Sequence, residues 1–563
     1  MHLSRGKNKH LLNLVNAFQK DGYEVRKITV KSDKIGMMAE HKTAANYETG
    51  KKKRAYYVEG TNYEMGYLLG LLAEKEIALM ASDFTDRVVF SFIGSSVLER
   101  MKLIQEFFIF IVYELTKGVY RQLPHEIRDE IQGIHDGCKK FNPGTRVDME
   151  HLIALNAGVD TLCSIIYTGD FLLKRMPVME PSDFRIPVMC NGFSVFGSAA
   201  GGGHYFGRDF MFPTADVFQD TAALIIYNPD KLPDREVYPY VSVNAPGMAG
   251  SIAAMNIKRV GIGVDMSPAA NCNTRNPGTN SLLLTRLCVQ SGGSAEHMVD
   301  IMRKTQRGVS WNYIIADGTN DRACIVEAGS SDSSPDFVDF PDEAFKKVLP
   351  GADFIKSHRS AQFQDGLMVR WNDYKYPEEY LEYNYRLWKY YNRKHHADKE
   401  IHDDAFSERG YINRSIFEKN CPLTFYFAPQ REKNNNIVIT TNHYIIPEMR
   451  YYAMHPWTSM IVGDRINDIQ WRYDELNNQI QNTLDRMGYI DYKAAKRLID
   501  FLAPYGKFPM YYSGNPKSRD GKQIRIEGCT SIFDLKKGSV ESHFGYYCDE
   551  WIRITLPNYF IYI

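Results

Sequence analysis

Apolar residues recur with helical spacing in the first third of the chain and with strand-like spacing after it. Between residues 60 and 170, segments such as YEMGYLLGLLAEKEIALM and VDMEHLIALNAGVDTLCSIIY place apolar side chains at i, i+3, i+4 and i+7, which predicts amphipathic helices. From residue 190 onward, short runs such as CNGFSVFG, TAALIIYN and WNYIIADG are separated by turn-rich stretches, which predicts strands. Two further helical stretches interrupt the strands, namely TNSLLLTRLCVQ with SAEHMVDIMRKTQ and, later, INDIQWRYDELNNQIQNTLDRM. This order favours an α+β fold with an antiparallel sheet at its centre.

The same patterns divide the chain into three parts. Residues 1–55 carry 13 Lys/Arg against 5 Asp/Glu, and we interpret them as a basic arm, either solvated and partly disordered or a nucleic-acid-binding or targeting tract. Residues 56–189 form the helical region and residues 190–563 the strand-rich region. Within the latter, residues 350–436 are rich in Tyr, Lys and Asn, which indicates an insertion, either a lid or binding loop or a surface excursion.

Composition excludes several classes of protein. Lys plus Arg (68) equals Asp plus Glu (68), so charge gives no reason to expect nucleic acid or an anionic membrane as a partner. No signal peptide is visible, and the most apolar run, FFIFIVY, is too short to span a bilayer. The nine cysteines form no CxxC pair and no metal motif is present, so we expect free thiols, a cytoplasmic location and neither metal nor cofactor.

One cysteine stands at the head of the strand-rich region, in MCNGFSVFGSAAGGGHYFGRDFMFP. Cys190 is either an ordinary buried thiol at the start of a strand or a nucleophile. The glycine run after it lacks the ending of a phosphate-binding loop and is better explained as a hairpin turn. If the two flanking strands pair, Arg208 faces Cys190, where its fixed charge would stabilise a thiolate or a substrate carboxylate.

An ordered set of segments resembles the penicillin acyltransferase family, which belongs to the cysteine branch of the N-terminal-nucleophile (Ntn) hydrolases, and more distantly the choloylglycine hydrolases. The set covers most of residues 57–556 apart from the insertion. Its members after the helical region are CNGFSVFG with FGRDF, GMAGSIAAMNIKRVGIGVDM, SWNYIIADG with CIVEAG, VITTNHYIIPEM, QWRYDEL and TSIFDLKKGSVESHFGYYCDEWIRITL. The resemblance implies a four-layer αββα sandwich preceded by a helical pro-region.

The resemblance also implies roles for individual residues. Cys190 would be the nucleophile, released as a new amino terminus by autocatalytic cleavage of the Met189–Cys190 bond. Its own α-amine, with a pKa of about 7.7, would then be the general base. Further roles follow for four residues: Arg208 would hold the nucleophile region or the substrate, Asn256 and Asn442 would donate N–H groups to the oxyanion, and Arg472 would orient these groups.

The sequence departs from the family pattern close to the nucleophile. The family places an Asp three residues after the Arg, where it contacts the α-amine, but this chain has Met211 there. Asp209 is the candidate to replace it, although adjacent strand residues point to opposite faces. Two other acidic residues are interpreted as structural: Asp265 as a turn residue, and Glu327 as a buried partner of an arginine.

The function that the resemblance implies is hydrolysis of a non-peptide or small peptide-like amide through a thioester acyl-enzyme. Two alternatives stay open at this stage. The first is an acyltransferase that passes the acyl group to an amine, and the second is an inactive binding protein on the same fold. The expected partner is a small-molecule amide, and homo-oligomer formation is left open.

Overall fold

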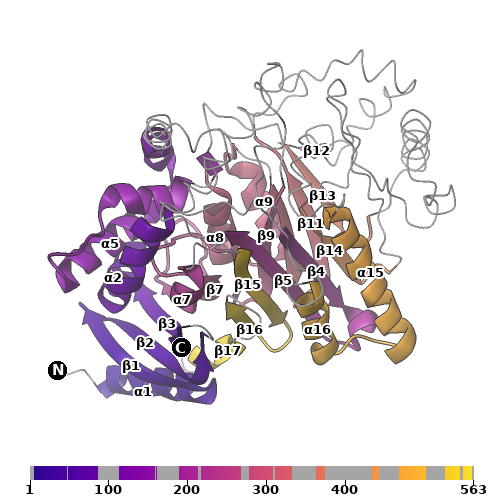
Figure 1. Ribbon diagram of the computed structural model, residues 1–563, viewed down its shortest axis with the longest axis horizontal. Helices are drawn as coiled ribbons and strands as arrows, with labels where there is room; N and C mark the ends of the chain where they lie inside the picture. Colours follow the sequence, from indigo (N-terminus) through magenta and orange to yellow (C-terminus); the bar gives the residue numbers. More distant parts are fainter. Residues whose placement is uncertain are drawn as a thin grey trace, which may run out of the picture.

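The structure is a computed structural model of the 563-residue chain. It combines helices and sheets in a mixed α and β fold (Figure 1). The description that follows covers residues 5–46, 49–85, 113–158, 160–161, 189–213, 217–267, 278–308, 311–331, 363–364, 366–374, 434–442, 468–502, 526–544 and 550–560.

The larger of the two sheets has eleven strands in the order β1-β2-β3-β6-β7-β8-β9-β10-β11-β13-β12. Neighbouring strands are antiparallel apart from β3 and β6, which run parallel. The strands are β1 (Tyr23–Lys31), β2 (Lys34–Ala45), β3 (Lys52–Gly60), β6 (Ala223–Pro229), β7 (Tyr240–Asn244), β8 (Ala253–Asn256), β9 (Val260–Met266), β10 (Trp311–Asp317), β11 (Arg322–Ala328), β12 (Phe363–Gln364) and β13 (Leu367–Trp371).

The smaller sheet is antiparallel and has the order β14-β4-β5-β15-β16-β17. Its strands are β4 (Met189–Phe196), β5 (His204–Pro213), β14 (Ile437–Thr440), β15 (Ile526–Asp534), β16 (Ser539–Phe544) and β17 (Ile552–Thr555). The longer helices are α1 (Arg5–Lys20), α2 (Asn62–Ala78), α5 (His125–Phe141), α8 (Ser281–Ser291), α9 (Ala295–Lys304), α15 (Asp468–Met487) and α16 (Tyr492–Leu502). Short helical pieces are η1 (Leu79–Phe84), η4 (Gly197–Ala200), α7 (Phe218–Thr221) and η7 (Leu556–Tyr559).

Strand β4 lies between the larger sheet and two helices. Strands β4 and β5 contact β9, β4 also contacts β10, and β14 contacts β11. A Cβ atom on Gly192 would lie 3.4 Å from Ile314 Cγ2 of β10, whereas its neighbour Phe193 packs in a cluster with Tyr473 and Leu476 of α15. Alternate residues of β4 therefore face the larger sheet and the helices, as strand geometry requires. Helices α8 and α9 contact the larger sheet, at β8 to β11.

The amino-terminal segment corrects the expectation of a basic arm over residues 1–55. Residues 5–45 form α1, β1 and β2, and the predicted boundary at residue 55 falls inside β3. Apolar residues such as Tyr23 and Met37 are fully buried, whereas the basic residues of β1 lie on its exposed and half-buried positions. The Thr555 backbone N–H donates to Asp21 Oδ2 at 2.8 Å, so this segment packs beside the carboxyl-terminal end of the chain (Figure 1).

The helical prediction for residues 60–170 is confirmed where the structure describes the chain, in α2, α5 and the helical residues 149–158. A fully buried ion pair joins α5 to α8, with Glu130 Oε2 2.9 Å from Arg286 Nη2. No helix within the described ranges is both long enough and apolar enough to cross a membrane.

A second link between the helical region and α8 involves a buried carboxyl group. Asp160 Oδ2 accepts hydrogen bonds from the backbone N–H and the hydroxyl of Ser281, both at 2.7 Å. Burial raises the pKa of Asp160 from 3.8 to about 7 against the lowering effect of these bonds. Between roughly pH 4 and pH 7 the folded protein therefore keeps a proton that the unfolded chain loses, and stability falls as pH rises.

Asp160→Asn is expected to reduce this pH dependence, because the amide stays neutral while keeping an acceptor for Ser281. The free energy of unfolding of the wild type should fall relative to the variant by roughly 1.4 kcal/mol per pH unit in this window. Thermal unfolding from pH 5 to pH 7.5 checks the prediction, with Asp300→Asn at an exposed helical site as control. Parallel curves for Asp160→Asn and wild type would contradict it.

The insertion predicted over residues 350–436 is shorter than expected on its amino-terminal side. Residues 363–371 include β12 and β13, and β13 pairs with β11 in the larger sheet. Residues 350–362, 365 and 375–433 of the predicted insertion lie outside the described residues. The described residues before 375 and after 433 lie next to each other, because Asn372 Nδ2 donates to the Asn435 backbone oxygen at 2.7 Å.

Replacing residues 376–432 with a short Gly-Ser linker is therefore expected to leave a soluble, folded core. Its melting temperature should change by only a few degrees, because the linker closes a gap that the hydrogen bond already spans. The substrate preference should change. A longer deletion that also removes β13 is the matched control and should prevent folding. If the shorter deletion itself fails to fold, the segment belongs to the core.

Candidate functional site

The predicted hairpin at Cys190 is confirmed. Strands β4 and β5 are antiparallel, with Cys190 opposite Phe210 and Gly192 opposite Arg208. The glycine run forms the turn between them, with left-handed φ angles of 57° at Gly201 and 86° at Gly202. Because Cys190 and Gly192 share a face of β4, Cys190 and Arg208 lie on the same side of the sheet, which is the side that faces β9 and β10.

Asn442 lies directly against the candidate nucleophile. The backbone N–H of Cys190 donates to Asn442 Oδ1 at 2.8 Å, and Asn442 Nδ2 donates to the Met266 backbone oxygen at 2.7 Å. Asn312 of β10 donates from Nδ2 to the Thr441 backbone oxygen at 3.0 Å and so fixes the segment that carries Asn442. The side chains of Cys190, Asn312 and Asn442 are all buried. The structure thus unites Cys190 and Asn442, which are 252 positions apart in the chain.

Arg208 brings a buried positive charge to the same place. Its side chain is 1% exposed, and Nη1 lies 3.1 Å from Asp265 Oδ1 while donating to the backbone oxygens of Asn191 and Asp209. Burial lowers the pKa of Arg208, but the negative charges of Asp265 and of an ionised Cys190 outweigh it and raise that pKa. Among the described residues, Arg208 Nε and Nη2 have no hydrogen-bond partner.

Asp265 lies in the candidate site, where the sequence interpretation did not place it. It is not a turn residue but a fully buried strand residue of β9, opposite Asn312 in the sheet register. An Asp is almost never fully buried unless it is paired, and here the partner is Arg208. The available signal was its place in VGIGVDM, a run whose other positions are all buried. Only the packing of β9 on β5 shows that the partner of Asp265 is Arg208.

Asp209 does not lie beside Cys190. It is opposite Asn191 in the hairpin, on the face of the sheet away from Cys190 and Arg208. Asn191 Nδ2 donates to Asp209 Oδ2 at 3.0 Å, and Thr530 Oγ1 donates to Asp209 Oδ1 at 3.2 Å. The proposal that Asp209 replaces the family's α-amine contact is therefore wrong, because a shift of one residue along a strand reverses the face.

Asn256 is also placed differently from the expectation. Its Nδ2 donates to the backbone oxygens of Val289 and Gly292, at 3.0 and 2.8 Å, and its Oδ1 accepts from the Val260 N–H at 3.2 Å. Both N–H bonds of the amide thus hold the carboxyl-terminal end of α8, and none remains for an oxyanion. Asn256 is a structural residue in this fold.

Arg472 belongs to α15, which contacts β4 and β14, but its side chain lies outside the described residues. The interpretation of Glu327 is confirmed, because Glu327 Oε1 lies 4.0 Å from Arg370 Nε and both side chains are buried. Arg370 Nη2 in turn donates to the backbone oxygen of Ile439 at 2.7 Å, which ties β13 to β14. In the described ranges, no group of three His, Cys, Asp or Glu side chains could hold a metal ion.

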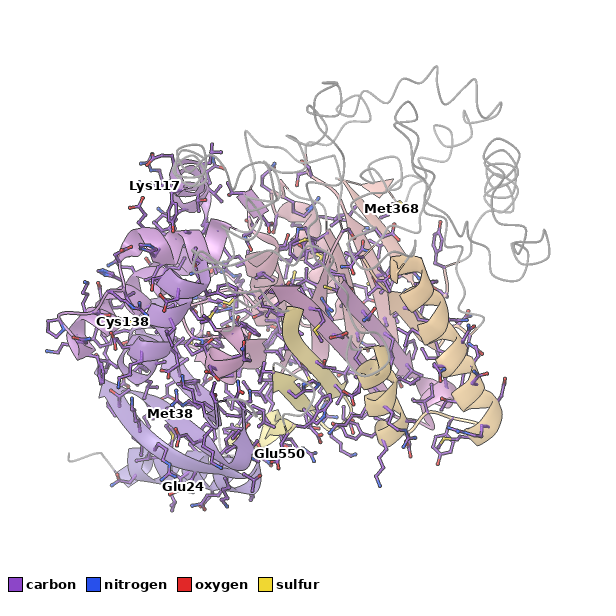
Figure 2. All side chains as sticks on the ribbon, in the orientation of Figure 1. Glu24, Met38, Lys117, Cys138, Met368 and Glu550 are labelled. Atoms are coloured by element: carbon purple, nitrogen blue, oxygen red, sulfur yellow. The ribbon has the colours of Figure 1, made fainter. Side chains whose placement is uncertain are left out.

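The other described cysteines lack the surroundings of a nucleophile. They are buried and free, and burial raises the pKa of each: Cys138, Cys288, Cys324 and Cys529. Figure 2 places Cys138 on α5, away from the β4–β5 hairpin. Within this set, Cys529 also interacts with Arg208, since it flanks Phe210 on the side away from Cys190. Cys190 alone among the five combines the arginine with a polar contact to Asn442.

Comparisons with known proteins give relatives but no family. None of the protein-family models matches the chain. An uncharacterized protein of Archaeoglobus fulgidus is 27% identical over 519 residues, which cover 91% of this chain and 67% of the relative. Two solved mutant forms of the conjugated bile acid hydrolase of Clostridium perfringens superpose with a TM-score of 0.33 at 12% and 11% identity. They cover 66% and 65% of this chain and 93% of theirs, and the overlap is too loose to support an argument.

Proposed function

We propose that this chain is a cysteine-type Ntn hydrolase that cleaves an amide bond through a thioester at Cys190. The observation that carries the proposal is the contact of the Cys190 backbone nitrogen with Asn442 Oδ1, beside the buried guanidinium of Arg208. A nucleophile needs a base within reach and a positive group near the developing charge. Arg208 supplies the positive group. Cleavage before Cys190 would supply the base, in the form of the new α-amine.

The proposed activation begins with attack of the Cys190 sulfur on the carbonyl carbon of Met189. The peptide nitrogen leaves as the new α-amine of Cys190, and water then cleaves the resulting thioester. That amine forms from the atom that now donates to Asn442 Oδ1 at 2.8 Å, so it is already held in place. Its pKa of about 7.7 suits a base that works near neutral pH.

In the proposed reaction, the α-amine accepts the thiol proton as sulfur attacks the substrate carbonyl. The tetrahedral intermediate expels the substrate amine, which takes that proton, and water hydrolyses the thioester. Charge on the intermediate would be met by Arg208 and Asn442, not by Asn256, whose donors are committed to α8. A preorganised donor of this kind typically contributes ~3 kcal/mol of barrier reduction.

The proposal includes the fold and its division. We assign residues 190–563 to an αββα sandwich of the Ntn type, supported by the contacts of β4, β5 and β14 with β9 to β11 and by helices on both sheets. The residues before Cys190 would be the pro-region, without the predicted boundary at residue 55, which falls inside β3. After cleavage the amino-terminal fragment should stay bound, because β3 pairs with β6 over seven residues and Glu130 pairs with Arg286.

Intact mass of the purified protein under denaturing conditions tests the proposal. Two fragments are expected, one of them beginning at Cys190. A thiol-reactive probe at neutral pH should label Cys190 before the other eight cysteines, because the adjacent α-amine accepts the thiol proton as sulfur reacts. Panels of amides with and without added hydroxylamine would then separate hydrolysis from acyl transfer. An intact chain without preferential labelling of Cys190 would instead favour a binding protein on this fold.

A further inference from the structure

Several ionisable groups of the described residues lie around Arg208 and Cys190 at the β4–β5 hairpin. The groups that act on Arg208 are Asp265 from β9, Cys190 from β4, Cys529 from β15 and Asp209 from β5. Asp209 lies on the opposite face of β5, bound to Asn191 and Thr530. Of these groups, the guanidinium of Arg208, the carboxylate of Asp265 and the thiols of Cys190 and Cys529 lie on the face towards the larger sheet.

We propose that Asp265 is a positioning residue that offsets the charge of Arg208, and thereby keeps the Cys190 sulfur protonated until the general base accepts its proton. In the ion pair at 3.1 Å, the carboxylate of Asp265 offsets the positive charge of Arg208. A thiolate at Cys190 would add a net negative charge to a buried site, which is costly. Without Asp265, the same charge rule would favour the thiolate, because Arg208 would lack its partner.

The ion pair places the carboxylate of Asp265 directly beside the guanidinium of Arg208. Arg208 Nη1 lies against Asp265, while Nε and Nη2 have no hydrogen-bond partner among the described residues. Nη1 also donates to the backbone oxygens of Asn191 and Asp209, so these bonds fix one edge of the planar group, while the Asp265 carboxylate supplies the opposite charge. The Arg208 guanidinium also lies 5.1 Å from the ring centre of Phe210, which limits its rotation further.

The consequence for the reaction rests on the proposed function. If sulfur and α-amine both start neutral, the proton moves from one to the other within the same residue as the carbon–sulfur bond forms. Asp265 would then determine the starting protonation state without touching substrate. Glu327 provides an internal comparison, because it is a second buried carboxylate of the same sheet but pairs with Arg370 instead.

The test is the pH profile of Cys190 alkylation by iodoacetamide, followed by mass spectrometry of the peptide that contains Cys190. Wild type should show a midpoint no lower than that of an ordinary thiol, about 8.5. Asp265→Asn should lower the midpoint by at least one pH unit, Asp265→Glu should leave it near wild type, and the control Glu327→Gln should not move it. The intact chain and the chain beginning at Cys190 give different peptides, so each form is compared with its own wild type.

The double variant Arg208→Gln/Asp265→Asn keeps the proposal testable if Asp265→Asn does not fold. It removes one positive and one negative charge together, so the net charge beside Cys190 is unchanged and the midpoint should lie within about half a pH unit of wild type. A double-variant midpoint more than one unit above wild type would overturn the proposal, as would an Asp265→Asn midpoint equal to or above wild type. A different result would contradict the proposed function, namely a wild-type chain that is uncut and inactive. That result does not depend on the pH profiles of alkylation.

Discussion

Cys190→Ala is expected to remain one chain of 563 residues and to hydrolyse no amide. The substitution removes the sulfur that would attack the Met189 carbonyl and the substrate, while the small side chain fits the same buried position. Loss of the nucleophile therefore abolishes both reactions without an unfolded protein. A denaturing gel, amino-terminal sequencing of any smaller band and an assay on an amide panel give the result.

Two further variants make the result specific. Cys190→Ser is expected to cleave slowly, because a hydroxyl can make the same acyl shift through an ester, and to acylate poorly. Cys529→Ala is the matched control, since Cys529 flanks Phe210 from the other side and also interacts with Arg208. It should be cut and active. Full activity in an uncut wild-type chain would exclude the α-amine as base.

Asn442→Ala is expected to lower kcat by about 100-fold with little change in fold. The amide now accepts from the Cys190 N–H at 2.8 Å and donates to the Met266 carbonyl. Its loss removes the group that holds the proposed α-amine and one donor near the developing charge. Steady-state kinetics at fixed pH, with circular dichroism to confirm folding, measures the effect. An unchanged turnover would remove Asn442 from the site.

Two control variants separate these contributions. Asn442→Asp keeps the acceptor but adds a negative charge, so the lower limb of the pH–rate profile should move to higher pH as the α-ammonium is stabilised. Asn256→Ala should reduce stability yet leave the kcat of the folded fraction within about threefold of wild type, because both Asn256 donors serve the end of α8. A large loss of kcat in this variant would reverse the assignment of Asn256.

The sequence by itself determined the elements and the candidate nucleophile. Apolar spacing predicted α2, α5, α8, α9 and α15 and the β4–β5 hairpin. The helical and the strand-like spacing of apolar residues both arise because one face of a helix or strand is buried. It also predicted that Arg208 shares a face with Cys190, since hairpin pairing follows from a turn a few residues long. The amino-terminal strands were missed because the high Lys and Arg count of residues 1–55 drew the interpretation away from short apolar runs such as residues 35–39 of β2, which are buried.

Only the tertiary structure decided which polar residues meet at Cys190. Asn442 follows β14 and Asp265 belongs to β9, strands that are distant in sequence and belong to different sheets, so no local pattern could connect them with Arg208 or Cys190. The same packing assigned Asn256 to the end of α8 and turned Asp209 to the other face. Local periodicity fixes the direction of a side chain relative to its own strand, whereas its partner depends on how the two sheets pack.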